Sequence, residues 1–159
     1  MELILWRHAE AEDGTPDLAR ALTPKGRHQA QKMAQWIKEQ LPAEVRDTVR
    51  IIASPAVRTR QTADALDLPY HIVPQIDPDA SADDLLAASG WPDGHGLVIL
   101  VGHNPAISVL ASRLAGAAES DIALRRAAAW WYASDTQTDG AQPRLTLKTV
   151  ITPSLLAPG

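Results

Sequence analysis

The sequence predicts an α/β fold: a three-layer α/β/α sandwich with a mostly parallel central sheet and a C-terminal antiparallel hairpin. Two observations predict it. Short apolar runs alternate with segments of helical periodicity over most of the 159 residues, and two strand-like segments then follow each other at the end of the chain. Strands separated by helices pair in parallel, whereas strands joined by a turn pair antiparallel. The length favours one domain spanning residues 1–159.

The predicted strands come from apolar or alternating runs. Four short runs, residues 3–6, 49–53, 70–73 and 97–101, contain the aliphatic side chains expected of buried strands. Two later segments, residues 127–133 and 144–151, flank the turn-rich stretch 134–142, and the second alternates apolar with polar side chains. These two segments predict the closing hairpin.

Helix-start signals separate these strands. Polar residues that can act as N-caps begin four predicted helices, at Thr23, Ser54, Ser81 and Asn104. Proline follows three of them, and proline suits the first helical position because no N–H is needed there. The first helix continues to about Leu41, and Ser81 forms a capping box with an aspartate three residues later. Glycines at positions 90 and 116 end the last two helices.

The composition is that of a soluble globular protein and excludes several classes of function. A net charge of −4 argues against general nucleic-acid binding, which needs a basic surface. The absence of cysteine excludes disulfides, thiol catalysis and thiolate metal sites. Because the sequence shows neither a basic leader nor an apolar stretch of about 18 residues, we expect a cytoplasmic protein with no membrane partner.

Cationic and imidazole side chains follow three of the predicted strands, at the point where each strand ends. They are Arg7 and His8 after the first run, Arg58 in the first turn of the helix after the second, and His103 after the fourth. Ligands of open α/β sheets bind at the carboxyl ends of the strands, and helix N-termini attract anions. The sequence therefore predicts an anion site with chemistry at one edge of the sheet.

Four motifs, in order, resemble those of the histidine phosphatase superfamily, in the small branch typified by the SixA phosphohistidine phosphatases. They are Arg7-His8-Ala9, where the family shows Arg-His-Gly; Leu22-Thr23-Pro24-Lys25-Gly26; Ser54-Pro55-Ala56-Val57-Arg58 with Gln61-Thr62-Ala63; and Gly102-His103-Asn104-Pro105. Order and spacing agree over about residues 1–115. The resemblance implies a phosphoglycerate-mutase-like fold, in agreement with the predicted sandwich.

The residues and the resemblance together predict a mechanism. His8 attacks phosphorus and forms a phosphohistidine enzyme, which water hydrolyses to release inorganic phosphate. Arg7 and Arg58 hold the phosphate oxygens, His103 is a further donor, and Asn104 contributes to substrate binding. This chemistry requires no cofactor. We also expect no metal, because the two arginines would repel a cation.

Two departures from the family pattern concern this site. Ala9 stands where glycine is usual, and Pro74-Gln75-Ile76 stands where SixA-like relatives tend to show Pro-Glu-Leu. Glutamine cannot donate a proton as an acid, so the general acid is Asp77 or Asp79, or there is none. An alkoxide leaving group needs an acid, whereas protonated phosphohistidine loses a neutral imidazole. A weak or missing acid therefore favours phosphohistidine as the substrate.

The interval between Arg58 and His103 favours the same substrate class. It contains 44 residues (59–102), too few for the helical lid with which small-ester members of the family enclose their substrates. An open site suits a phosphorylated protein, so the expected partner is a phosphohistidine-bearing domain. Two alternatives are a phosphatase for small phosphate esters or phosphoramidates, and a non-catalytic phosphate-binding interaction module.

Overall fold

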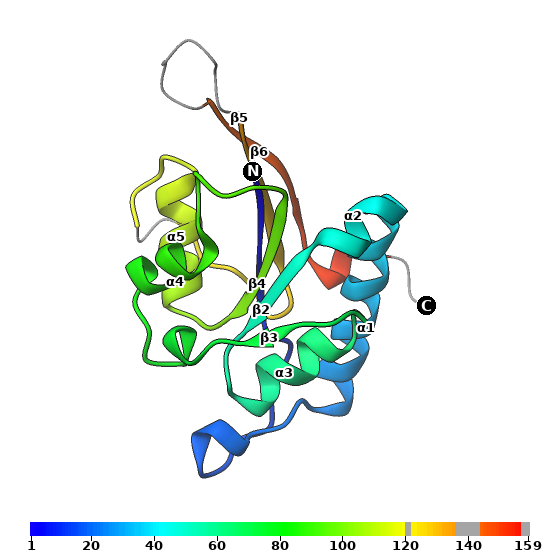
Figure 1. Cartoon of the computed structure of the whole chain (residues 1–159). Helices are drawn as coiled ribbons and strands as arrows, with labels where there is room; N and C mark the ends of the chain where they lie inside the picture. Colours follow the sequence, from blue (N-terminus) through cyan, green and yellow to red (C-terminus); the bar gives the residue numbers. More distant parts are fainter. Residues whose placement is uncertain (120–121, 136–143, 157–159) are drawn as a thin grey trace.

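The computed structural model describes residues 1–119, 122–135 and 144–156, and it confirms the predicted α/β class (Figure 1). The strands are β1 (Glu2–Arg7), β2 (Arg50–Ala53), β3 (His71–Ile72), β4 (Leu97–Gly102), β5 (Ala129–Asp135) and β6 (Arg144–Ile151). The α-helices are α1 (Pro24–Glu39), α2 (Ala43–Thr48), α3 (Val57–Asp64), α4 (Ala82–Ser89) and α5 (Ala106–Leu114). Single 3₁₀ turns are η1 (Asp17–Ala19), η2 (Pro74–Ile76) and η3 (Pro153–Leu155).

The sheet is mostly parallel, as predicted. Its six strands lie in the order β3-β2-β4-β1-β5-β6, and the pairs among β3, β2, β4 and β1 are parallel. β5 pairs antiparallel with both β1 and β6, which confirms the closing hairpin. β5 extends to Asp135, and residues 136–143 of the predicted turn lie outside the described residues.

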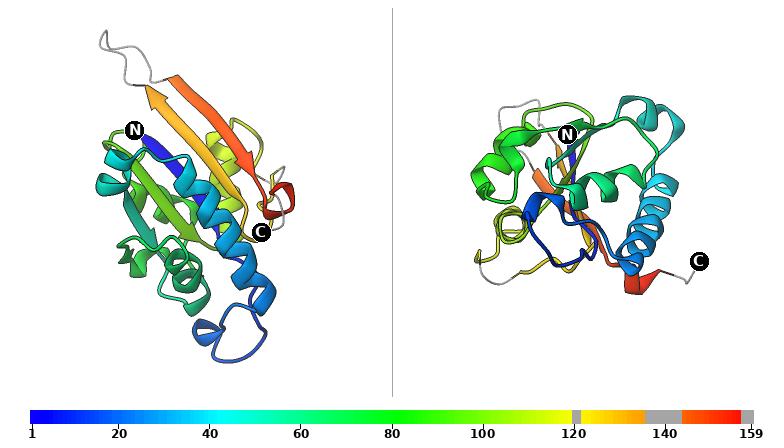
Figure 2. Two further views of the ribbon diagram at one scale, coloured as in Figure 1. Left: turned by 90° about the vertical axis from the view of Figure 1, so that its right-hand side faces the viewer. Right: turned by 90° about the horizontal axis from the view of Figure 1, so that it is seen from below.

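Two hydrophobic cores cover the two faces of the sheet, because successive strand side chains point to opposite faces. Ile4 and Trp6 of β1 belong to the core formed with α1 and α3, whereas Leu3 and Leu5 belong to the core formed with α4 and α5. Figure 2 shows the two groups of helices on either side of the sheet. All four side chains are buried, and each large apolar side chain contributes about 1.5–3 kcal/mol on burial. This packing makes the sheet a rigid support for the residues that follow the ends of its strands.

Two of the predicted helix starts are confirmed in detail. At the start of α1 the hydroxyl of Thr23 accepts a hydrogen bond from the Gly26 N–H. At the start of α4, Ser81 and Asp84 form the predicted capping box, and Gly90 ends that helix with a left-handed φ of 74°. In both cases the capping residues are local in sequence, so the pattern was sufficient to predict them.

The other two predicted caps are wrong. α3 begins at Val57 with Ala56 as its N-cap, so Ser54 and Pro55 precede the helix. The Ser54 hydroxyl accepts from the N–H of Ala56 at 3.3 Å and also contacts the ring of His103, 49 residues away. α5 begins at Ala106, and its N-cap is Pro105 rather than Asn104. In both places the polar side chain also has a distant partner, which is His103 for Ser54 and Leu124 for Asn104.

Candidate active site

The ends of β1 and β4 bring His8 and His103 together. The two strands are parallel and in register, with Arg7 opposite Gly102, and the His8 N–H donates to the Gly102 carbonyl at 3.1 Å. Each histidine follows its strand directly, so the two rings meet at the same edge of the sheet, with centroids 5.2 Å apart and planes inclined at 59°. The predicted convergence of the two histidines is confirmed.

The surroundings of His8 define its protonation. Its Nδ1 lies 2.7 Å from the carbonyl oxygen of Ala9, and a carbonyl can only accept, so Nδ1 carries the proton. The Nε2 of the neutral ring then keeps a free lone pair. Burial, together with the charges of Arg58 and Arg7, lowers the pKa of His8 to about 4 against the opposing effect of the Ala9 hydrogen bond. His8 is therefore a neutral imidazole near pH 7.

His103 is also held neutral. Burial, followed by the neighbouring His8 and Arg58, lowers its pKa to about 3. Its Nε2 lies 2.7 Å from the Ser54 hydroxyl, while its Nδ1 is buried without a hydrogen-bond partner among the described residues. Ser54 is a site residue that the sequence analysis missed, because its position before a proline was interpreted as a helix cap.

Arg58 is buried, with 4% of its surface exposed, and it reaches the site from the first turn of α3 as predicted. Its two terminal nitrogens donate to Asp17, one to the backbone carbonyl at 2.9 Å and one to the carboxylate at 3.0 Å. Its Nε is buried without a partner among the described residues. Unpaired buried donors are costly, so this group is suited to an anionic acceptor.

Arg7 likewise combines a hydrogen-bonded terminal nitrogen with an unpaired Nε. One terminal nitrogen donates to the Leu124 carbonyl at 2.8 Å, and Nε is buried without a partner among the described residues. Burial, and then the charge of Arg126, lowers the pKa of Arg7. With Arg58 Nε and His103 Nδ1, the site thus contains three buried nitrogens without a hydrogen-bond partner among the described residues. A phosphate group offers oxygens for donors of this kind.

Asp17 is the second site residue that the sequence analysis missed. Its carboxylate accepts from Arg20 and from Arg58, each at 3.0 Å, and these two hydrogen bonds hold its pKa below the usual value. Asp17 is therefore ionised near pH 7 and cannot act as a proton donor. It lies in a segment without hydrophobic periodicity and reaches a residue 41 positions away, so no local pattern marks it.

Asn104 supports a neighbouring loop. Its amide donates to the Leu124 carbonyl at 3.2 Å, and its oxygen accepts from the Ser108 hydroxyl, which also accepts from the Leu124 N–H. Arg7 donates to the same Leu124 carbonyl, so Asn104 helps to fix an arginine of the site. Its direct contact with substrate stays a prediction.

The two predicted acid candidates lie just after η2. The Asp79 N–H donates to the Asp77 carboxylate at 2.9 Å, which closes a local turn. Among the described residues, no hydrogen bond or ion pair joins Asp77 or Asp79 to the histidines and arginines of the site. Their role as acids stays a prediction.

In the described part of the chain, no group of three or more acidic or histidine side chains is arranged to hold a metal ion. No helix in the same part of the chain combines the length and apolar character needed to cross a membrane.

Known proteins resemble this chain in sequence. The profile of the histidine phosphatase superfamily (branch 1) matches residues 3–81. The chain is 28% identical over 123 residues to the phosphohistidine phosphatase SixA of Escherichia coli (strain K12), a match that covers 72% of this chain and 74% of that protein. It is 30% identical over 122 residues to the uncharacterized protein Rv1276c of Mycobacterium tuberculosis (strain ATCC 25618 / H37Rv), covering 74% and 75%.

Solved structures resemble the fold. A Nakamurella multipartitia protein, whose proposed identity is a SixA phosphohistidine phosphatase, has a TM-score of 0.75 at 28% identity, covering 96% of this chain and 95% of that one. A phosphoserine phosphatase from Entamoeba histolytica, in complex with 3-phosphoglyceric acid, has a TM-score of 0.64 at 20% identity, covering 91% and 94%. The fold alone therefore does not select the substrate. Sequence and structure together show that the chain belongs to the histidine phosphatase superfamily, in its SixA-like branch.

Proposed function

We propose that this protein is a phosphohistidine phosphatase that acts through a phosphorylated His8. The observation that carries the proposal is a neutral imidazole with a free Nε2 beside two arginines, Arg7 and Arg58, whose buried Nε–H groups have no acceptor among the described residues. A nucleophile for phosphorus and donors for phosphate oxygens are the two requirements of phosphoryl transfer. The retained nucleophile argues against a non-catalytic phosphate-binding module.

The reaction has two steps. In the first, the lone pair of His8 Nε2 attacks phosphorus, the P–N bond of the substrate breaks, and the protonated substrate ring leaves as neutral imidazole. In the second, water attacks the phosphoryl group on His8; the P–Nε2 bond breaks, inorganic phosphate is released, and the water protons remain with phosphate and solvent. The hydrogen bond from Nδ1 to the Ala9 carbonyl keeps Nε2 as the reactive nitrogen throughout. Arg7 and Arg58 stabilise the charge on the phosphate oxygens, and we expect no metal requirement.

The choice of phosphohistidine over a phosphate ester as substrate depends on whether a carboxyl group near the site can act as a general acid. Among the described residues, Asp17 is the one carboxylate that hydrogen-bonds to a histidine or arginine of the site, and it is held ionised. An ester requires a proton on its leaving alkoxide, whereas protonated phosphohistidine does not. The similarity to a protein named phosphohistidine phosphatase SixA supports the same choice. We therefore propose a phosphorylated protein as the partner.

Rapid quenching with a peptide carrying radiolabelled phosphohistidine tests the mechanism. We expect an acid-labile, base-stable phosphoryl group on His8, and His8→Ala should lower kcat by roughly three orders of magnitude or more. His95→Ala, an exposed histidine, is the matched control and should leave kcat unchanged. Label on a serine, or an active His8→Ala enzyme, would contradict the proposed nucleophile. A higher kcat/KM for aryl phosphates than for the peptide would contradict the proposed substrate.

A further inference from the structure

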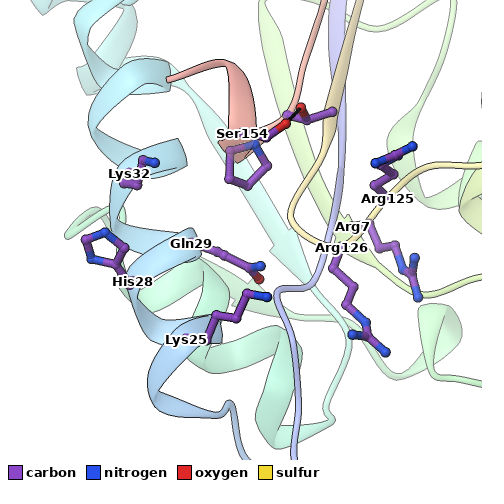
Figure 3. A pocket seen from close by; sticks show the side chains of 10 residues that line it. Arg7, Lys25, His28, Gln29, Lys32, Arg125, Arg126 and Ser154 are labelled. Atoms are coloured by element: carbon purple, nitrogen blue, oxygen red, sulfur yellow. Dashed lines mark hydrogen bonds between the residues drawn. The ribbon is translucent and has the colours of Figure 1, made fainter. Parts of the chain in front are cut away.

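A basic cavity of about 660 Å³ lies beside Arg7, between α1, η3 and the segment that precedes β5 (Figure 3). Five of its ten lining residues are cations, Arg7, Lys25, Lys32, Arg125 and Arg126, and the other five include no aspartate or glutamate. We call this cavity the basic groove. The chain as a whole has 15 lysines and arginines, 19 aspartates and glutamates, and a net charge of −4. One third of its basic residues therefore line one groove in an otherwise acidic protein.

The cations of the basic groove are arranged along its length. Lys25 and Lys32 lie seven residues apart on α1, two turns of the helix, so their backbones are separated by about 10 Å. Arg125 and Arg126 lie on the opposite wall (Figure 3). Such a row suits an extended set of negative charges better than one compact anion. Lysines, as flexible point charges, bind carboxylates in variable geometry.

Few of these charges are neutralised by the protein itself. Arg126 forms an ion pair with Glu10 at 3.1 Å and is still 57% exposed. Within the described part of the chain, no ion pair involves Lys25, Lys32, Arg125 or Arg7. The charge of Arg126 also lowers the pKa of Arg7, so the cations are close enough to repel one another. An anionic ligand would relieve this repulsion.

Arg7 connects the basic groove to the active site. It lines the groove, directly precedes His8, and donates to the carbonyl of Leu124, the neighbour of Arg125. A ligand that occupies the groove therefore meets the residue that directly precedes the nucleophile. The volume of the basic groove is within the range of sites that enclose small molecules or several side chains.

We propose that the basic groove binds an acidic segment of the phosphorylated protein substrate, whose aspartate and glutamate side chains pair with the α1 lysines and the opposite arginines. This inference rests on the proposed function, because it assigns the groove to the same substrate. The groove supplies affinity and orientation, and the phosphoryl group is transferred at His8. Electrostatic attraction of this kind acts mainly on binding and on the rate of association.

The test compares two phosphohistidine peptides that differ in charge, one with flanking glutamates and one with glutamines in their place. The variant Lys25→Glu with Lys32→Glu reverses two groove charges and leaves the catalytic residues intact. We expect its kcat/KM for the glutamate peptide to fall about tenfold or more through KM, with kcat unchanged, whereas the glutamine peptide is unaffected. Added salt should reduce the preference of the wild type for the glutamate peptide.

The matched control reverses two charges on α1 outside the basic groove, Arg27→Glu with Lys38→Glu, and should retain the preference. Equal losses on both peptides with the groove variant would overturn the proposal. So would stronger competition by inorganic triphosphate than by the unphosphorylated glutamate peptide, because the groove would then be a site for small polyanions.

A direct measurement of peptide binding tests the basic groove independently of the proposed phosphatase function. Fluorescence anisotropy with the unphosphorylated glutamate peptide requires no catalysis, so binding that is lost in the groove variant supports the groove even if the enzyme prefers phosphate esters. Hydrolysis of phosphohistidine without any binding of that peptide would overturn the groove and leave the proposed function standing.

Discussion

Arg58 is a buried cation whose partner, the Asp17 carboxylate, is half exposed. Because the pair is exposed on the Asp17 side, phosphate can compete with this carboxylate for the guanidinium. Arg58→Ala should lower kcat/KM by about two to three orders of magnitude, as expected when one preorganised donor is removed from a charged transition state. Steady-state kinetics and inhibition by inorganic phosphate measure the effect.

Arg60 provides the control for Arg58. It lies two residues later on α3, and Arg60→Ala should keep kcat/KM and phosphate inhibition within about twofold of the wild type, a small energetic change. An Arg58→Ala protein that unfolds early but binds phosphate normally would show that Arg58 is a structural residue.

The role of Asp77 and Asp79 as candidates for the general acid is also tested at the scale of single residues. If Asp77 or Asp79 protonates the leaving group, the double variant Asp77→Asn, Asp79→Asn should lose most activity on phosphate esters with poor leaving groups and little on phosphohistidine. A series of aryl phosphates of graded leaving-group pKa measures this dependence. Asp47→Asn, an exposed carboxylate on α2, is the control. An unchanged dependence would exclude both aspartates, and equal losses on both substrate classes would assign them a structural role.

At the scale of elements, α1 packs closely against the segment that follows His8. Gly26 permits this approach: a Cβ there would lie 2.0 Å from the carbonyl oxygen of Glu10, two residues after His8. Thr23 stabilises the same contact. Its N–H donates to the Glu10 carbonyl at 3.0 Å, and its hydroxyl donates to the Glu10 carboxylate at 2.8 Å. The start of α1 thus holds the chain just beyond the nucleophile.

Gly26→Ala should therefore affect both stability and catalysis. The clash is with backbone, which cannot rotate away, so we expect a loss of about 1–3 kcal/mol in the free energy of unfolding together with a lower kcat. Urea denaturation and steady-state kinetics measure the two effects. Gly94→Ala is the control, because its new Cβ would lie 3.1 Å from the flexible Met1 side chain and 3.2 Å from the Gly90 carbonyl, much farther than 2.0 Å. Unchanged stability and activity in Gly26→Ala would show that the contact is dispensable.

At the scale of the whole molecule, the two buried imidazoles make stability depend on pH. Folding lowers the pKa of His8 from 6.5 to about 4 and that of His103 from 6.5 to about 3. Below pH 6.5 the unfolded chain therefore binds more protons than the folded chain, and the free energy of unfolding decreases as the pH falls from 6.5 towards 4. From pH 7 to pH 5 we expect a loss on the order of 2 kcal/mol per histidine. The lowered pKa of Asp17 affects the free energy of unfolding only below pH 3.8, the usual pKa of an aspartate carboxyl group.

Urea denaturation at pH 7 and at pH 5 measures this loss. The double variant His8→Asn, His103→Asn should lose much less stability over the same interval, whereas His71→Asn with His95→Asn, two exposed positions, should behave like the wild type. A site variant with the wild-type pH dependence would mean that other groups cause the acid sensitivity.

The sequence by itself determined the α/β class, most of the elements and the convergence of Arg7, His8, Arg58 and His103. Local periodicity and capping patterns are sufficient to predict strands, α1 and α4, because these elements form from residues near one another in the chain. The four site residues follow from one further rule, that parallel strands end at a common edge of the sheet. The six residues of α2 carry too short a pattern to be recognised.

Only the tertiary structure decided how these side chains pair. The contacts of Ser54 with His103, of Asp17 with Arg58 and of Gly26 with Glu10 join segments that are distant in sequence or unrelated by any periodic pattern. The two wrong cap predictions have this cause, because a polar side chain near a helix start has both local and distant partners. The basic groove is likewise formed by four segments brought together by packing of the sheet and α1. Local preferences select the elements, whereas the free energy of burial selects which distant groups meet.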